Sequence, residues 1–235
     1  QSFVGHGGYI KECTRPDIAV PLKYLSRYTT KFGAKHVRMA KYLLRYLRGT
    51  SHKGITYRTG FPLFMQVYTD ASHASCNDTR RSITSVVVKY GGNTIFWKSA
   101  FTKIVSHSST ESELMALDSG ATTTQFLRWL IESIGGPIQG QIVVFVDNLG
   151  ASQIVSNPVQ PGRNLHVHAR YFYVRDLIYG GEVVTLHLPT EIQIADVGCT
   201  FKSTSSFVTL REYLMGCARV RHNESGIPEW DMIAE

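Results

Sequence analysis

The stretch ITSVVVKYGGNTIFW, residues 83–97, predicts a β-hairpin and with it the fold class. Its two arms, Ile83–Tyr90 and Thr94–Trp97, are rich in β-branched and aromatic residues, which pack well on a pleated surface. Gly91-Gly92-Asn93 separates the arms, and these residue types adopt the positive φ values that tight hairpin turns need. A similar run, Leu63–Thr69, precedes the hairpin. The chain is therefore expected to contain three meandering strands here.

Helical and strand patterns alternate after the hairpin. A long helix is predicted first, because Ser109–Ile134 is free of proline and ends at Gly135-Gly136-Pro137. The later predicted elements are a strand at Ile142–Val146, helices at Gly150–Ser156 and Asn164–Tyr179, a strand at Val183–Leu188, and a helical segment containing Asp196. Three meandering strands followed by alternating elements describe an α/β protein with a mixed sheet flanked by helices.

Four acidic residues lie where this topology can gather them. Asp70 ends the first strand, Glu113 lies near the start of the long helix, Asp147 follows the fourth strand and Asp196 follows the fifth. Each alone has an ordinary explanation, since such residues are often turn formers, helix caps or solvent-facing groups. Together, clustered carboxylates repel one another and need cations between them. Two Mg²⁺ ions about 4 Å apart suit phosphodiester hydrolysis, because one activates water and the other stabilises the leaving oxygen.

Residues 1–60 predict a separate, strongly basic helical segment. Its net charge is +10, whereas the other 175 residues carry −3. Within it, Ala34–Arg48 has the spacing of a helix with one buried face. The predicted apolar row is Val37, Ala40, Leu44 and Leu47. The basic row repeats that spacing one residue later, at Arg38, Lys41, Arg45 and Arg48. The charge asymmetry favours a nucleic-acid contact over merely solvated side chains.

Composition excludes several classes of protein. Hydrophobic residues make up 43% and charged residues 18%, which argues against a disordered chain. The four cysteines (Cys13, Cys76, Cys199 and Cys217) lack the spacing of a zinc site and are typical of reduced thiols in an intracellular protein. No apolar run reaches the roughly 18 residues of a membrane span. The first residues lack the pattern of a signal peptide, and no membrane partner is expected.

Two sets of motifs, in order along the chain, resemble copia-type retrotransposon Pol polyproteins. TRPDIA (14–19), LSR (25–27) and LLRYLRGT (43–50) look like the end of the reverse transcriptase. The motifs that resemble the RNase H domain are YTDA (68–71), RRSITS (80–85), WKS (97–99), SSTESE (108–113), VDN (146–148), NP (157–158), RY (170–171), VR (174–175) and LPTE (188–191). The resemblance covers about residues 5–202 and is specific as an ordered set.

The resemblance implies an RNase H-like fold, a five-stranded mixed sheet flanked by helices, and Mg²⁺-dependent cleavage of the RNA strand of RNA–DNA hybrids during reverse transcription. It implies Asp70, Glu113, Asp147 and Asp196 as catalytic ligands of two Mg²⁺ ions, with Mn²⁺ as a substitute. Contacts to the RNA 2′-hydroxyl are expected from Ser72 and Asn148, and phosphate contacts from the basic row. The implied partners are the hybrid and the remainder of the polyprotein, in a cytoplasmic virus-like particle or the nucleus.

We expect residues 1–60 to be a remnant of the reverse transcriptase thumb and connection, residues 61–202 an RNase H-like domain, and residues 203–235 a C-terminal tail. The family usually follows the last Asp with Ile or Leu, Phe, Thr and Lys, and here VGCTFK (197–202) stands instead. A catalytically inactive nucleic-acid-binding remnant is therefore the alternative to an active enzyme. An integrase-like transferase is disfavoured, because those enzymes place their Glu after the second Asp. No Asp-Asp pair is present, so polymerase activity is not expected.

Overall fold

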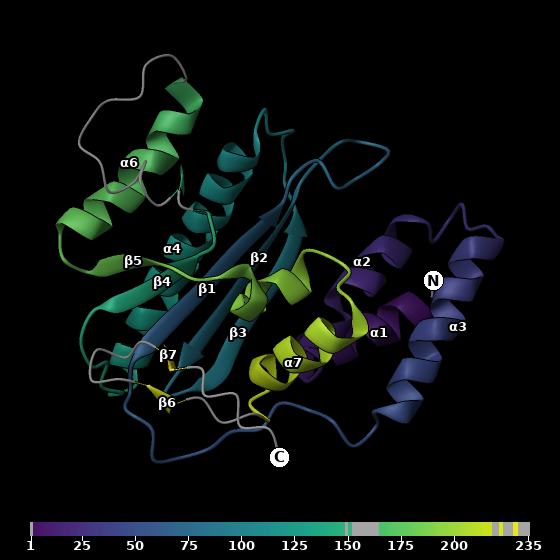
Figure 1. Cartoon of the computed structure of the whole chain (residues 1–235), viewed down its shortest axis with the longest axis horizontal. Coiled ribbons are helices and arrows are strands. Elements are labelled where there is room, and N and C mark those ends of the chain that lie inside the picture. The colour runs from purple at the N-terminus through teal and green to yellow at the C-terminus, as the bar shows by residue number, and fades with distance from the viewer. Residues whose placement is uncertain (1, 149, 152–164, 218–220, 223–227, 230–235) are drawn as a thin grey trace.

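The computed structural model of the chain describes residues 2–148, 150–151, 165–217, 221–222 and 228–229. A five-stranded sheet in the order β3-β2-β1-β4-β5 forms its centre (Figure 1). The strands are β1 (Met65–Ser72), β2 (Ile83–Tyr90), β3 (Asn93–Phe101), β4 (Ile142–Val146) and β5 (Val183–His187). β1, β2 and β3 pair antiparallel, and β4 and β5 add in parallel beyond β1. The predicted α/β fold with an RNase H-like five-stranded mixed sheet is confirmed.

The predicted hairpin is present as β2 and β3. Gly91 and Gly92 connect the two strands with φ values of 55° and 72°. These positive φ values are easily reached by glycine, which has no Cβ atom, and they give the tight turn the twist that the flanking strands require. The turn therefore forms for the reason predicted from its residue types.

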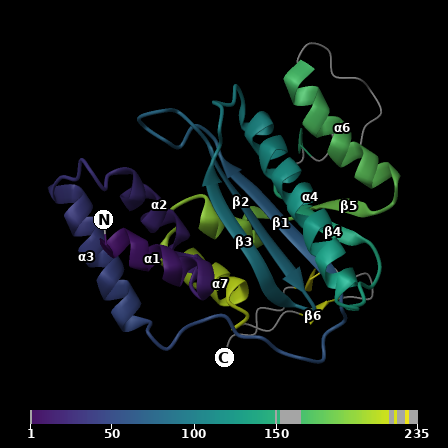
Figure 2. The same ribbon diagram turned by 180° about the vertical axis from the view of Figure 1, so that it is seen from behind.

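Both faces of the sheet are covered. The helices α4 (Ser109–Ser133) and α6 (Leu165–Tyr179) pack on one face, and the 3₁₀ helix η3 (Ile194–Gly198) and α7 (Thr204–Leu214) on the other (Figures 1 and 2). Successive side chains of a strand point to opposite faces, so Val144 joins the α4 side whereas Val143 and Phe145 join the α7 side. The central strands are consequently apolar on both faces.

The basic N-terminal segment is helical, as expected, and lies beside the sheet. It consists of α1 (Ser2–Cys13), the 3₁₀ helix η1 (Pro16–Ile18), α2 (Ala19–Arg27) and α3 (Ala34–Gly49). These helices share a small core of their own. They pack against the rest of the chain where α2 contacts β3 and η3, and where η1 contacts α7 (Figure 2).

The apolar row predicted on α3 is wrong in part. Val37 and Leu44 are 41% and 51% exposed, and the buried residue of the helix is Leu43. Met39 and Tyr46, one turn to either side of Leu43, pack with it against α2. The helix is rotated from the predicted orientation because this second set of apolar residues, also at helical spacing, has the partner surface.

The predicted tail from residue 203 is also wrong over its first part. Ser203 caps α7 by accepting a hydrogen bond from the amide of Ser206, and Leu210 and Leu214 are buried against the sheet. Phe207, Leu210 and Leu214 have the i, i+3, i+7 spacing of a buried helix face, so the sequence does contain a signal for this helix. Farther on, β6 (Arg221–His222) pairs with β7 (Pro228–Glu229).

The predicted helix Gly150–Ser156 falls mostly outside the described residues, as does the NP motif at 157–158. Within the described ranges, we find no helix with the length and hydrophobicity needed to cross a membrane.

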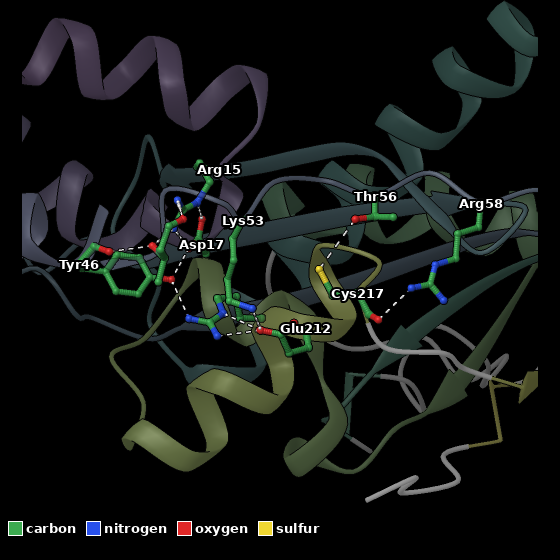
Figure 3. A network of polar contacts seen from close by, with 10 residues as sticks. Arg15, Asp17, Tyr46, Lys53, Thr56, Arg58, Glu212 and Cys217 are labelled. Carbon is green, nitrogen blue, oxygen red and sulfur yellow. Dashed lines mark hydrogen bonds and ion pairs between the residues drawn. The ribbon is translucent and has the colours of Figure 1, made fainter. Parts of the chain in front are cut away.

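A buried polar network joins the N-terminal helices to α7 (Figure 3). Arg15 donates to both carboxylate oxygens of Asp17, at 2.9 and 2.8 Å, and both residues are buried. The Tyr46 hydroxyl donates to the same carboxylate and accepts a hydrogen bond of 3.2 Å from Arg211. Glu212 then pairs with Lys53 at 2.9 Å. The network explains why the TRPD motif and α7, almost 200 residues apart in sequence, form one body.

We expect Tyr46→Phe to lower the melting temperature, because it removes a hydrogen bond to a buried carboxylate. The loss should be about 2 kcal/mol, or roughly 4–8 °C for a chain of this size. Tyr42→Phe is the matched control on the same helix, since Tyr42 is 70% exposed. Thermal melts of the two variants check this, and equal melting temperatures would show that the network adds nothing to stability.

Candidate active site

Asp70 and Asp147 lie at the carboxyl ends of the neighbouring parallel strands β1 and β4: Asp70 is within β1, two residues before its last residue, and Asp147 directly follows β4. Tyr68 of β1 lies opposite Phe145 of β4. Asp70 and Asp147 each come two residues later, so the register brings them side by side. Asp70 is buried and Asp147 is half-buried.

Glu113 reaches the same end of the sheet because α4 packs very closely on β1. At Gly120 a Cβ atom would lie 2.5 Å from Cγ2 of Thr69, so only glycine allows this approach. Glu113 precedes Gly120 by two turns and shares its helix face. Its side chain is 7% exposed, and its Oε2 atom has no hydrogen-bond partner among the described residues.

The three carboxylates form a candidate metal centre. Asp70, Glu113 and Asp147 each offer one oxygen, and these three atoms lie within 4.8 Å of one another. A buried carboxylate oxygen without a partner is costly unless a cation satisfies it. An all-oxygen ligand set suits a hard divalent cation such as Mg²⁺. The residues present therefore fit the metal that the sequence predicted.

Asp196, the fourth predicted acid, lies next to this group but outside it. It is part of η3 and is buried. Its Oδ2 atom forms an ion pair with the ammonium group of Lys202. The structure thus brings all four acids to one region but gives Asp196 a different partner.

Burial, and after it the proximity of these carboxylates to one another, raises their pKa values and so disfavours their charged forms. The pKa of Asp70 is raised to about 7, first by burial and then by the charges of Asp196 and Asp147. The pKa of Glu113 is raised to about 9, by burial and then by Asp70 and Asp147. Burial also raises the pKa of Asp196, an effect that Lys202 opposes. Without a cation, the site holds negative charge at a cost to the folded state.

We expect Asp70→Asn to stabilise the metal-free protein at pH 8. The pKa of Asp70 is raised from 3.8 to about 7 in the folded protein, so the folded protein becomes less stable as the pH rises from about 4 to 7 and this carboxyl group ionises. Asparagine does not ionise and therefore avoids this loss of stability. A gain of about 1–2 kcal/mol corresponds to roughly 2–8 °C. Thermal melts in EDTA at pH 8 and pH 5 check this, with a smaller gain expected at pH 5. A lower melting temperature of the variant at pH 8 would contradict it.

Several groups outside the four acids hold the site together. The side chain of Gln193 donates to the carbonyl oxygens of Thr69 and Phe145, at 3.1 and 3.4 Å, and so ties β1 to β4 beside the acids. The Cys199 thiol donates to the carbonyl oxygen of Asp70 at 3.2 Å. Gly198 leaves room for β2, because a Cβ atom there would lie 2.3 Å from the Ser85 hydroxyl. The segment after Asp196, which departs from the family pattern, is therefore closely fitted to the sheet.

Two residues beside Asp147 were missed in the sequence. His187, the last residue of β5, contacts the carbonyl oxygen of Asp147 through Nε2 at 3.1 Å. The hydroxyl of Thr190 donates to the Asp147 carboxylate at 3.4 Å. Thr190 belongs to the quoted LPTE motif, but only the parallel pairing of β4 and β5 shows its proximity to Asp147.

Ser72 and Asn148 lie beside the acids. Ser72 is the last residue of β1 and is half-buried. Asn148 is also half-buried, and its Oδ1 atom accepts a hydrogen bond of 3.1 Å from the amide of Ala151. The Oδ1 atom of Asn148 is thus engaged by the backbone of a neighbouring residue.

The basic row on α3 is exposed along its whole length, at Arg38, Lys41, Arg45 and Arg48. Tyr42, itself exposed, lies under the guanidinium group of Arg45, 4.9 Å from ring centroid to Cζ. A cavity of about 650 Å³ separates α2 and α3 from the segment 197–207. Arg38 and Lys202 both line it, so it links the basic row to the region of Asp196.

The chain is thus an α/β protein with an RNase H-like five-stranded sheet, in which three acids gather from β1, from the residue after β4 and from the packed helix α4. The chain is 32% identical over 183 residues to the retrovirus-related Pol polyprotein from transposon RE1 of Arabidopsis thaliana, a match that spans 78% of this chain and 12% of that polyprotein. It is 31% identical over 196 residues to the Pol polyprotein from transposon TNT 1-94 of Nicotiana tabacum, spanning 83% and 15%. The chain therefore belongs to the family of copia-type Pol polyproteins from transposons.

The chain spans only 12–15% of the length of these curated relatives. No model of a protein family matches it. Similar solved structures include LC11-RNase H1 in complex with an RNA/DNA hybrid, at 17% identity and a TM-score of 0.43, covering 56% of this chain and 91% of that one. A foamy viral protease-reverse transcriptase in complex with double-stranded DNA has 14% identity and a TM-score of 0.49, covering 81% and 31%.

Proposed function

We propose that the chain is a divalent-metal-dependent ribonuclease H that cleaves the RNA strand of RNA–DNA hybrids during retrotransposon reverse transcription. The observation that carries the proposal is the buried group of Asp70, Glu113 and Asp147, with one carboxylate oxygen of Glu113 left without a partner. Family membership gives the context, because Pol polyproteins of transposons are the relatives of this chain.

The role that we propose for each residue follows from its position in the site. Asp70, Glu113 and Asp147 hold the cation, with Asp196 beside them. When bound, Mg²⁺ supplies Lewis-acid activation of water and stabilisation of the leaving oxygen, and Mn²⁺ is a suitable substitute. Gln193 keeps the strand ends at a fixed separation, and Thr190 orients the carboxylate of Asp147. Fixed ligand positions matter because small misplacements in a reacting site cost large factors in rate.

Selectivity for RNA requires contacts to the 2′-hydroxyl, which DNA lacks. Ser72 and Asn148 are our candidates for these contacts because both are half-buried and lie within two residues of Asp70 and Asp147. We further propose that the hybrid is presented by the remainder of the polyprotein, in a cytoplasmic virus-like particle or the nucleus.

The alternative of an inactive nucleic-acid-binding remnant rested on the departure at residues 197–202. That segment is well packed, since Val197 and Cys199 are buried and Gly198 fits against Ser85. It also leaves Asp196 buried next to the other acids. These observations support the enzyme over the remnant.

A panel of labelled substrates tests the proposal. The purified chain is incubated in Mg²⁺ with an RNA–DNA hybrid, double-stranded RNA, double-stranded DNA and single-stranded RNA of one sequence. We expect shortening of the RNA strand of the hybrid alone. Equal cleavage of double-stranded RNA or of DNA would refute the proposed specificity.

We expect the basic row to bind phosphates. Changing Arg38, Lys41, Arg45 and Arg48 to Gln should weaken binding to many hybrid sequences alike, because phosphate contacts carry no sequence information. Each lost duplex contact should flatten the plot of log binding constant against log salt by about 0.9. Titrations at several salt concentrations check this, and Arg128→Gln on α4 is the control for loss of one charge. An unchanged slope would mean that the row is only solvated surface.

A further inference from the structure

One of the four acids already has a cationic partner from the chain itself. Lys202 forms its ion pair with Asp196 from the connection between η3 and α7. The side chain of Asp196 is 6% exposed and that of Lys202 is 21% exposed, so the pair is largely shielded from solvent. Shielded pairs interact more strongly than pairs on an open surface.

The ligand geometry separates the four acids into two sets. Asp70, Glu113 and Asp147 offer oxygens within 4.8 Å of one another, a group that does not include Asp196. The free Oε2 atom of Glu113 belongs to the first set. The second set consists of Asp196 with its ammonium partner. A cation can therefore bind between Asp70, Glu113 and Asp147, whereas beside Asp196 the ammonium group of Lys202 already provides positive charge.

The net charge of the site also separates Asp196 from the other three acids. Once all four carboxyl groups are ionised they carry four negative charges, which two divalent cations would balance. With the Lys202 ammonium in place, one divalent cation leaves a single negative charge, whereas a second would make the centre positive. A second cation beside Asp196 would also face the ammonium group at short range and be repelled by it.

We propose that Lys202 takes the place of the second cation in the substrate-free protein, so that the site binds one divalent cation tightly and a second only weakly. This inference rests on the proposed function, because it assumes that the acids bind metal. It assigns different affinities to the two Mg²⁺ ions that the family resemblance implies.

The location of Lys202 indicates how the second position would become available. The same lysine lines the cavity between the N-terminal helices and segment 197–207, together with Arg38. A nucleic-acid phosphate entering beside Asp196 brings negative charge that Lys202 can pair with instead. The hybrid would thereby free Asp196 for a cation when the scissile phosphate is present, and the substrate-free enzyme would hold an incomplete metal centre.

Titration of the metal-free protein with Mn²⁺, followed by isothermal calorimetry and by the paramagnetic resonance signal of unbound Mn²⁺, tests the inference without reference to cleavage. We expect one tight site in the wild-type chain and a second that is at least ten times weaker. Lys202→Gln should tighten the second site at least tenfold and leave the first unchanged. Lys202→Arg, which keeps the charge, should behave as the wild type.

Lys53→Gln is the matched control, because Lys53 also pairs with a carboxylate and its side chain is 22% exposed. It should bind Mn²⁺ as the wild type does. Two sites of equal affinity in the wild type, or no change of the second site in Lys202→Gln, would overturn the inference and leave the proposed function standing. Absence of Mn²⁺ binding in every variant would instead reject the metal centre of the proposed function, and the inference with it.

Discussion

Glu113→Gln is expected to slow cleavage of the hybrid by a factor of at least about 100, a rise in the activation barrier of roughly 2.7 kcal/mol. Glu113 is buried beside Asp70 and Asp147, and its Oε2 atom lacks any partner in the described structure. Glutamine keeps the volume of the side chain but removes the charge that would hold a cation. The single-turnover rate with saturating Mg²⁺ is the quantity to measure.

Glu111→Gln is the matched control, because Glu111 lies two residues earlier on the same helix. Its carboxylate accepts a hydrogen bond from the amide of His107, and its own amide donates to Ser108, so it caps the start of α4. We expect this variant to keep most of the activity and to melt slightly lower, by the few tenths to 1 kcal/mol of a helix-end interaction. The opposite ranking, with both variants folded, would move the catalytic assignment to Glu111.

Asp147→Asn is expected to abolish Mg²⁺-dependent cleavage while binding of the hybrid persists. Asp147 is the half-buried member of the group, and asparagine removes its ligand charge with little change of volume. Asp176→Asn, at an exposed position of α6, controls for loss of one negative charge. Rates and hybrid affinities are measured in parallel for both variants. Cleavage by Asp147→Asn at the wild-type rate would show that the metal centre is assigned to the wrong residues.

The sheet and the grouping of the acids follow from patterns that are local in sequence. Gly91-Gly92-Asn93 between two β-branched runs predicts a hairpin without knowledge of the rest of the chain. Asp70 and Asp147 could be assigned to one end of the sheet because each directly follows a run predicted as a strand, although β1 extends past Asp70 to Ser72 in the structure. Glu113 could be chosen over Glu111 because it shares a helix face with Gly120, where α4 contacts β1.

The parts that were predicted wrongly depend on partners far away in sequence. Leu43, rather than Leu44, is buried on α3 because α2 supplies the matching surface. The spacing of Phe207, Leu210 and Leu214 indicates that residues 204–214 are helical, but the surface that buries this face comes from the sheet and from η1. The ion pair between Lys202 and Asp196, which are close in sequence, was not predicted because it depends on the path of the chain between η3 and α7. Periodicity and spacing alone determine none of these contacts.

Cleavage of an RNA–DNA hybrid labelled on both strands tests most directly whether these acids form a metal-dependent ribonuclease H site. The wild-type chain is compared in Mg²⁺ and in EDTA, with its folding checked by circular dichroism in both. We predict shortening of the RNA strand alone, in Mg²⁺ and not in EDTA, with products that carry 5′-phosphates. An intact RNA strand after prolonged incubation of the folded protein with Mg²⁺ or Mn²⁺, or equal cleavage in EDTA, would contradict this account.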